Sequence, residues 1–195
     1  MMNFLKRRAK PSHDAYAVVT GAGSGIGRSF ALELTRRNGV VICADVNLDG
    51  ARETVALIEQ LGGRAYAVHC DVGNADAVRE LSEQAESLLG HPVTLLINNA
   101  GVGLGGKFTD TSLEDWKWCM HVNLWGVING CHAFVPGFKK LGRGAIINVA
   151  SAASYTAAPE MSAYNVTKAG VRALSETLYA ELKADNISVN VLCPT

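Results

Sequence analysis

Tyr164 and Lys168 place a phenol and an ammonium group four residues apart, in a segment whose apolar spacing predicts a helix. On a helix, residues i and i+4 lie on one face. A lysine held beside a tyrosine favours the phenolate, which makes the tyrosine a usable proton donor and acceptor near neutral pH. A Tyr-x-x-x-Lys pair also occurs on solvated helix faces, where charges do little. The meaning of the pair therefore depends on the residues upstream of it.

A glycine-rich turn, TGAGSGIG, follows the first predicted strand and opens the first predicted helix. Glycines let the backbone turn tightly and approach a diphosphate, which binds the free N–H groups at a helix N-terminus. The spacing is Gly-x-x-x-Gly-x-Gly. We predict a dinucleotide site formed by Gly21, Ser24, Gly25, Ile26 and Gly27, and a glycine turn without a ligand is the alternative.

Two acidic residues follow the next two predicted strands. A carboxylate at Asp45 would accept hydrogen bonds from the adenosine ribose and repel a 2′-phosphate, which favours NAD over NADP. Arg28 and Arg36 remain alternatives for neutralising such a phosphate, and Asp45 could instead cap the next helix. Asp71 and Val72 lie where the adenine edge is expected, although a simple turn aspartate explains the carboxylate equally well.

Three polar residues complete the candidate catalytic set. We expect Ser151 to end the fifth strand, at the carboxyl edge where open α/β sheets bind ligands. Ser154 is a second hydroxyl nearby, and we prefer Ser151 because Ser154 lies further out in the loop. Asn123 sits in a mostly apolar helix, where an amide must be hydrogen-bonded. A satisfied core amide is its alternative role.

Short apolar runs alternate with longer amphipathic stretches, which predicts a doubly wound parallel sheet of the Rossmann type, an α/β fold in three layers. The expected strands are Ala15–Thr20, Val40–Asp45, Arg64–Cys70, Val93–Asn98, Ala145–Ala150 and Ile187–Cys193, and the expected helices are 25–38, 47–62, 74–90, 112–140 and 162–185. The expected N-caps are Asn74 and Ser112, and the expected C-terminal stops are Gly39, Gly62 and Gly90.

The 195 residues suit one Rossmann domain over 14–195, preceded by a basic arm over 1–13. Lys and Arg balance Asp and Glu, 18 against 18, so no global field favours nucleic acid or an anionic membrane. No apolar run is long enough to span a bilayer. Five cysteines without Cys-x-x-Cys spacing indicate buried thiols in a reducing, cytoplasmic setting, and no histidine pattern indicates a metal site.

Taken together, the glycine spacing, Asn98-Asn99-Ala100-Gly101, Asn123, Ser151 and Tyr164-x-x-x-Lys168 resemble the short-chain dehydrogenase/reductase family, from about residue 14 to the last residue. The resemblance implies that Tyr164 is the acid/base, that Lys168 activates it and binds the nicotinamide ribose, and that Ser151 orients the substrate oxygen. Asn123 would support a proton-relay water.

The resemblance also implies that Asn99, Ala100, Gly101 and Pro194 line the cofactor cleft and that the chain forms at least a homodimer, or a homotetramer. Family members continue past a Pro-Gly, whereas this chain ends in Pro194-Thr195. We therefore expect a C-terminally truncated member that lacks the last strand and helix. Trp116, Trp118 and Trp125 are expected in the core or at the subunit contact.

The expected function is hydride transfer between NAD(H) and a secondary alcohol or ketone. A dinucleotide-binding fragment without turnover, or a redox sensor, is the alternative that the early C-terminus favours. A nucleotide-sugar epimerase is disfavoured because that group uses Gly-x-x-Gly-x-x-Gly spacing and a larger C-terminal domain. The pocket is expected from 101–110 and 152–162, which are mostly small or apolar and suggest an uncharged substrate.

Overall fold

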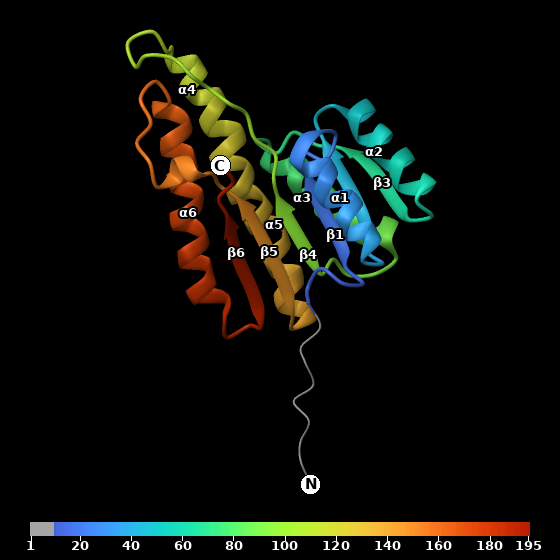
Figure 1. The fold of residues 1–195 in the computed structure, drawn as a ribbon. Helices are drawn as coiled ribbons and strands as arrows, with labels where there is room; N and C mark the ends of the chain where they lie inside the picture. Colours follow the sequence, from blue (N-terminus) through green and yellow to red (C-terminus); the bar gives the residue numbers. More distant parts are fainter. Residues whose placement is uncertain (1–9) are drawn as a thin grey trace.

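A six-stranded parallel sheet lies between two layers of helices (Figure 1) in the computed structural model, which describes residues 10–195. The sheet order is β3-β2-β1-β4-β5-β6, and every neighbouring pair is parallel. The strands are β1 (Tyr16–Thr20), β2 (Val40–Asp45), β3 (Arg64–His69), β4 (Leu95–Asn98), β5 (Gly144–Val149) and β6 (Ile187–Leu192). The predicted doubly wound α/β architecture is therefore confirmed.

The helices follow the strands in alternation, as the sequence pattern predicts. They are α1 (Gly25–Arg36), α2 (Leu48–Gln60), α3 (Ala75–Leu89), α4 (Leu113–Met120), η1 (His121–Trp125), α5 (Gly126–Leu141), η2 (Ala152–Ser154) and α6 (Ser162–Leu182). Parallel strands cannot be joined by tight hairpins, so each crossover helix packs back onto the sheet.

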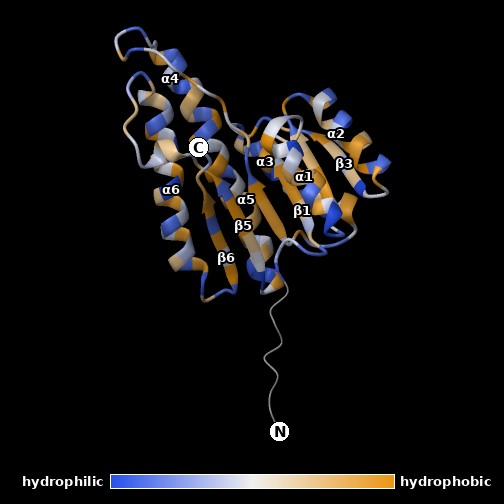
Figure 2. Ribbon diagram, viewed as in Figure 1, coloured by the Kyte–Doolittle hydropathy of each residue, from blue (hydrophilic) through white to orange (hydrophobic). Residues whose placement is uncertain are grey.

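Each central strand contributes to two separate cores, because successive side chains of a strand point to opposite faces. In β1, Val18 packs with the core under α3, α5 and α6, whereas Ala17 and Val19 pack with the core under α1 and α2. Figure 2 shows the central strands β1, β4 and β5 as mostly apolar, whereas the helices carry hydrophilic residues on part of their surface. Burial on both faces explains why these strands read as continuous apolar runs in the sequence.

The predicted single helix over 112–140 is wrong in one respect. Helix α4 ends at Met120, a π-helical segment η1 follows, and α5 starts at Gly126. A π-turn adds one residue to the helical path and shifts the phase of the side chains that follow. Gly126 packs against Val72, where a Cβ atom would come within 2.6 Å of the valine side chain.

Most predicted helix ends are confirmed. Asn74 and Ser112 cap α3 and α4 through their side chains, and Gly90 ends α3 in the left-handed conformation. Gly62 likewise lies just past the end of α2 with a positive φ. The prediction for Gly39 is wrong, because Asn38 takes the left-handed position after α1 (φ 63°), a role asparagine can also fill.

The predicted basic arm falls mostly on residues 1–9, which lie outside the described residues. Within residues 10–195, β6 pairs only with β5 and so occupies a sheet edge. All five cysteines are free, four of them buried and Cys193 half-buried, which agrees with the expectation of unpaired thiols. None of the helices over these residues is both long and apolar enough to cross a membrane.

Candidate active site

The carboxyl ends of the parallel strands open into a cleft of about 1050 Å³. Ligands bind at this edge in open α/β sheets, because the loops that follow the strands converge there. The cleft brings together all but one of the residues selected from the sequence, namely Gly21, Ser24, Gly25, Ile26, Gly27, Asp45, Asp71, Val72, Asn99, Ala100, Gly101, Ser151, Tyr164, Lys168 and Pro194. Asn123 is the exception, because it lies behind the cleft wall.

The glycine turn forms the floor of the cleft at the start of α1. Gly21 and Gly25 both adopt positive φ angles (65° and 53°), which glycine tolerates at little cost. Gly27 has no room for a side chain, because a Cβ atom would lie 2.0 Å from the carbonyl oxygen of Gly21. Helix α1 has no side-chain N-cap and no acidic residue in its first turn. Its first N–H groups are thus left for an anion at the cleft.

Asn99 and Thr20 brace the glycine turn against β4. The hydroxyl of Thr20 accepts hydrogen bonds from the N–H groups of Asn99 (3.0 Å) and Ala100 (3.1 Å). In return, the Asn99 amide donates to the carbonyl oxygens of Thr20 (2.9 Å) and Gly21 (3.2 Å). These bonds fix the turn relative to the central strand and use the polar side chains that would otherwise be unsatisfied.

Asp45 is held at the end of β2 by two backbone donors. Its Oδ2 accepts from the N–H of Gly23 and its Oδ1 from the N–H of Asn47, both at 2.8 Å. Each oxygen keeps a further lone pair for a ligand hydroxyl. Arg28, one alternative ligand for a 2′-phosphate, is occupied by Thr54 and Glu53, each at 3.0 Å.

Arg36 lies in the last turn of α1, at the opposite end of the helix from the glycine turn, and contacts Glu33. It does not line the cleft.

Asp71 and Val72 also line the cleft. Oδ1 of Asp71 accepts from the N–H of Gly73 (3.0 Å), which is the turn role expected for an aspartate here. Its Oδ2 lies 3.5 Å from Nε2 of His121, a half-exposed residue at the start of η1. One oxygen of the carboxylate thus stabilises the turn while the residue still lines the cleft. The turn role and the role beside the adenine are therefore compatible.

Tyr164 and Lys168 lie on the same face of α6, and both line the cleft. The lysine Nζ is 5.6 Å from the centroid of the tyrosine ring and donates a hydrogen bond to the carbonyl of Val149 (2.9 Å). Lys168 is only 4% exposed, and burial lowers its pKa to about 8, an effect that nearby Cys119 opposes. The strand carbonyl therefore fixes the cation beside the phenol ring.

Ser151 lies two residues beyond the end of the fifth strand, whereas the sequence predicts that it ends the strand. Strand β5 ends at Val149, and Ser151 caps the short helix η2, with its Oγ accepting from the N–H of Ala153 (3.1 Å). Since that bond uses a lone pair, the Ser151 hydroxyl hydrogen remains available to a ligand. Ser154 is buried, lies 3.7 Å from the sulfur of Cys193 and does not line the cleft.

Asn123 is fully buried, and its amide is satisfied by the chain itself. Oδ1 accepts from the N–H of Val102 (2.7 Å), while Nδ2 donates to the carbonyl of Val102 (2.9 Å) and approaches the hydroxyl of Thr167 (3.4 Å). The core-amide alternative thus describes the side chain well. Through Val102, Asn123 fixes the backbone of the loop that borders the cleft.

Trp118 does not occupy the core position that the sequence analysis allows for it. Its side chain is 47% exposed and lines the cleft together with Val122, and the alternative of a subunit contact stays a prediction. The spacing of four residues between them was the available signal, because i and i+4 share a helix face. Cys70, His121, Met161 and Thr195 also line the cleft.

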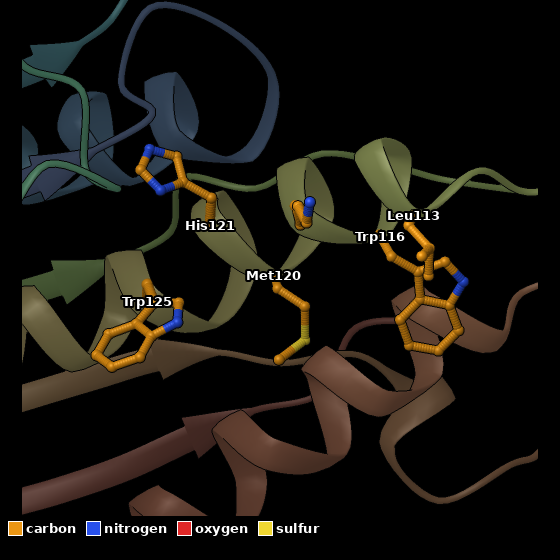
Figure 3. Close-up of a pocket in the computed structure, with 6 residues that line it drawn as sticks. Leu113, Trp116, Met120, His121 and Trp125 are labelled. Carbon is orange, nitrogen blue, oxygen red and sulfur yellow. The ribbon is translucent and has the colours of Figure 1, made fainter.

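The other two tryptophans border a second hollow of about 420 Å³ along α4 and η1, shown in Figure 3. It is lined by Leu113, Trp116, Lys117, Met120, His121 and Trp125. His121 points to the opposite side of the helix from Met120 in this view. Trp125 is 53% exposed, so it does not occupy a core position, and the alternative of a subunit contact stays a prediction for this residue.

The family model for short chain dehydrogenases matches residues 15–195. A structure of a short chain dehydrogenase/reductase from Burkholderia phymatum, in complex with NAD, superposes with a TM-score of 0.91 at 36% identity. The superposition covers 95% of this chain and 66% of that one. The chain therefore belongs to the short-chain dehydrogenase/reductase family of oxidoreductases.

Two curated relatives give the same assignment. The chain is 33% identical over 178 residues to the 7alpha-hydroxysteroid dehydrogenase of Escherichia coli K12, covering 91% of this chain and 69% of the relative. It is 39% identical over 182 residues to EphD of Mycobacterium tuberculosis, which is named as an oxidoreductase. The chain spans only 31% of the length of EphD.

Proposed function

We propose that this chain binds NAD(H) and transfers a hydride between the cofactor and a secondary alcohol or ketone. The observation that carries the proposal is the single cleft, which contains the glycine turn, Asp45, Ser151, Tyr164 and Lys168. A dinucleotide that rests on the α1 N-terminus and extends along the cleft would bring its nicotinamide toward the tyrosine. This arrangement supports dehydrogenation of an alcohol and the reverse reduction.

Residues of the chain itself accept and donate the proton of the substrate hydroxyl. When bound, NAD supplies an acceptor for the hydride that leaves the alcohol carbon. In that direction Tyr164 takes the proton of the alcohol hydroxyl, while Ser151 donates its hydroxyl hydrogen to the same oxygen. The Val149 carbonyl fixes the ammonium group of Lys168 beside the ring of Tyr164. From this position its positive charge stabilises the phenolate through space. Asn123 holds the loop at Val102 in place behind them.

A preference for NAD over NADP is part of the proposal. The carboxylate of Asp45 lies against Gly23 at the expected adenosine ribose site, and the nearby guanidinium of Arg28 is already bonded to Thr54 and Glu53. A 2′-phosphate there would meet a negative charge. Replacing Asp45 with serine should weaken NADH binding and strengthen NADPH binding, and fluorescence titration with both cofactors measures this. An unchanged ratio of the two dissociation constants would contradict the preference.

The substrate is proposed to be uncharged around its reacting carbon. Near Ser151 and Tyr164, the segments 102–103 and 153–161 contribute Val102, Gly103, Ala153, Thr156, Ala158 and Met161 to the cleft lining. None of these side chains bears a charge, and burying an unpaired carboxylate or phosphate against them would be costly. Apolar alcohols and ketones are therefore the class to screen first.

The decisive experiment is a titration of the 195-residue chain into NADH, followed by cofactor fluorescence. A saturable change supports the proposal, and its absence would refute cofactor binding. Turnover is then measured with a panel of apolar secondary alcohols, both for this chain and for a version extended at its C-terminus. NADH binding without turnover in either protein would favour the alternative function, a dinucleotide-binding module or redox sensor.

We also propose that the chain associates with copies of itself, as a homodimer or a homotetramer. The support is the apolar side chains that α4, η1 and α6 leave exposed, among them Leu113, Trp125, Val166 and Tyr179. Leu113 and Trp125 also line the hollow in Figure 3. Burial of such residues against a second copy would remove apolar surface from water.

A further inference from the structure

The backbone of the glycine turn is held from behind by two side chains that do not line the cleft. The hydroxyl of Thr54, on α2, donates to the carbonyl of Ala22 at 2.8 Å. The guanidinium of Arg28, one helical turn into α1, donates to the carbonyl of Gly23. The two side chains also contact each other, because Nε of Arg28 donates to Oγ1 of Thr54 at 3.0 Å. Together they hold the carbonyl oxygens of Ala22 and Gly23.

The N–H groups of the same two residues are held from the other side. Ala22 donates to the carbonyl of Ala44 (3.2 Å), and Gly23 donates to Oδ2 of Asp45 (2.8 Å). All four backbone polar groups of Ala22 and Gly23 therefore have partners within the chain. Their peptide planes cannot rotate without breaking these hydrogen bonds.

Close packing leaves Arg28 little freedom to do anything else. The turn crosses α2 backbone to backbone, where a Cβ atom on Gly50 would lie 3.2 Å from the Gly23 carbonyl. Arg28 is 28% exposed and also pairs with Glu53 at 3.0 Å, in addition to its bonds to Thr54 and Gly23. A guanidinium with this many fixed acceptors is pre-organised, and a lysine could not reproduce its planar fork.

We propose that Arg28 and Thr54 form a positioning pair that sets the glycine turn for the diphosphate of the cofactor. The inference rests on the proposed NAD(H) binding and names residues that act on it indirectly. With Ala22 and Gly23 locked, the chain enters α1 at a fixed angle. The N–H groups that follow then keep one orientation toward the cleft. Loss of the pair would let the turn relax and weaken the bonds to the diphosphate.

Two substitutions test the pair with matched controls. Thr54→Val keeps the shape of the side chain and removes the hydroxyl, whereas Thr54→Ser keeps the hydroxyl. Arg28→Met removes the guanidinium, and Arg36→Met removes an arginine of the same helix that lies away from the cleft. Dissociation constants are measured for NADH, for ADP-ribose and for adenosine, which lacks the diphosphate. Circular dichroism and thermal melting report whether each variant folds.

We expect Arg28→Met and Thr54→Val to raise the dissociation constants of NADH and ADP-ribose about tenfold. This is the effect of losing one charged hydrogen bond between a backbone N–H of the turn and the diphosphate. Adenosine binding should change less than about twofold, and Thr54→Ser and Arg36→Met should resemble the native chain. A general loosening of the fold would instead weaken adenosine binding as much as ADP-ribose binding, and that result would overturn the inference. If Arg28→Met does not fold, the Thr54→Val and Thr54→Ser pair decides.

The outcome is separable from that of the proposed function. If the native chain fails to bind NADH, the proposed function falls and the inference falls with it. If the native chain binds NADH and folded Arg28→Met and Thr54→Val bind it equally well, only the inference is wrong. A selective loss of NADPH binding in Arg28→Met would assign Arg28 to a 2′-phosphate and would also contradict the positioning role.

Discussion

At the scale of single residues, the candidate chemistry depends on where the buried cation of Lys168 is held. Its Nζ bonds to the Val149 carbonyl at the end of β5 and lies 5.6 Å from the Tyr164 ring centroid. The strand end therefore determines the distance between amine and phenol. A charge at this separation acts through space and strongly in a poorly solvated site.

Replacing Tyr164 with phenylalanine should remove turnover and leave cofactor binding intact. The phenol oxygen is the proposed proton acceptor, and general acid–base groups contribute about 10² to 10⁴ in rate. We expect kcat to fall by about that factor, while the dissociation constant for NADH changes by less than about twofold. Tyr179→Phe, on the same helix but exposed away from the cleft, serves as the control. Equal losses in both variants would contradict the assignment.

Lys168 should make the stability of the protein increase with pH on the alkaline side. Burial lowers its pKa from 10.5 to about 8 in the folded state, so the charged form is disfavoured there. Below pH 8 both states carry the proton and the full penalty is present. Between the two pKa values the unfolded state binds more protons, and stability rises as pH rises.

The measurement compares the native chain with Lys168→Met in denaturant at about pH 7 and about pH 9.5. The native chain should gain about 2 kcal/mol relative to the variant across this interval. Lys183→Met, which removes an exposed lysine, should show no such difference. A parallel response of the native chain and Lys168→Met would mean that Lys168 titrates normally.

At the scale of elements, the glycine turn and α1 work as one unit. Helix α1 has no side-chain cap, whereas Asn47, Asn74 and Ser112 cap α2, α3 and α4. Its first N–H groups are left for another partner, and they face the cleft. Gly27 lets this helix start directly over the Gly21 carbonyl. The close approach is what a larger residue would destroy.

Gly27→Ala should destabilise the protein and prevent NADH binding. A Cβ atom there would lie 2.0 Å from the Gly21 oxygen, so the turn must move away from α1. Overpacking of this kind costs about 1–3 kcal/mol. Gly137→Ala is the control, because α5 has room at that position and alanine favours helix by about 0.5–1 kcal/mol. Thermal melting and NADH titration of both variants measure the contrast.

At the scale of the whole molecule, the strand order β3-β2-β1-β4-β5-β6 assembles the site. The order reverses between β1 and β4, so the chain after β1 turns to α1 on one face of the sheet and the chain after β4 leads to α5 on the other, which leaves a crevice between them. Residues separated by more than 100 positions, such as Asp45 and Tyr164, thereby line one cleft. Helices α4 and α6 leave the apolar side chains of Leu113, Val166 and Tyr179 exposed, and these support the proposed association.

Trp125→Glu should shift the protein toward monomer. The side chain is 53% exposed in the single chain and borders the apolar hollow on η1. A carboxylate buried against a second copy would lack a partner and oppose association. Light scattering after size-exclusion chromatography gives the mass of native chain and variant. Leu61→Glu, at the exposed end of α2, is the matched control, and unchanged masses in all three would place the contact elsewhere or argue for a monomer.

The sequence by itself determined the fold class and most of the residues that line the dinucleotide half of the cleft, although Asn123 does not line it and Trp118 was not selected for it. Continuous apolar runs predict parallel strands that are buried on both faces. The glycine spacing and the Tyr-x-x-x-Lys pair are local patterns that do not depend on how the helices and strands pack. These signals depend on neighbours in the chain, so they can be read without the fold. The caps Asn74 and Ser112 belong to the same class, because a cap is satisfied within one turn.

Only the tertiary structure decided which polar atoms were already occupied. The side-chain amide of Asn123 is hydrogen-bonded to the backbone of Val102, and the guanidinium of Arg28 to Thr54 and Glu53. The partners in these bonds are at least 21 positions apart in the sequence. The phase of the long central helix was also unreadable, because a π-helical segment shifts every side chain beyond Met120. Hydrogen bonds between distant segments are fixed by how the layers meet, and no local pattern records that.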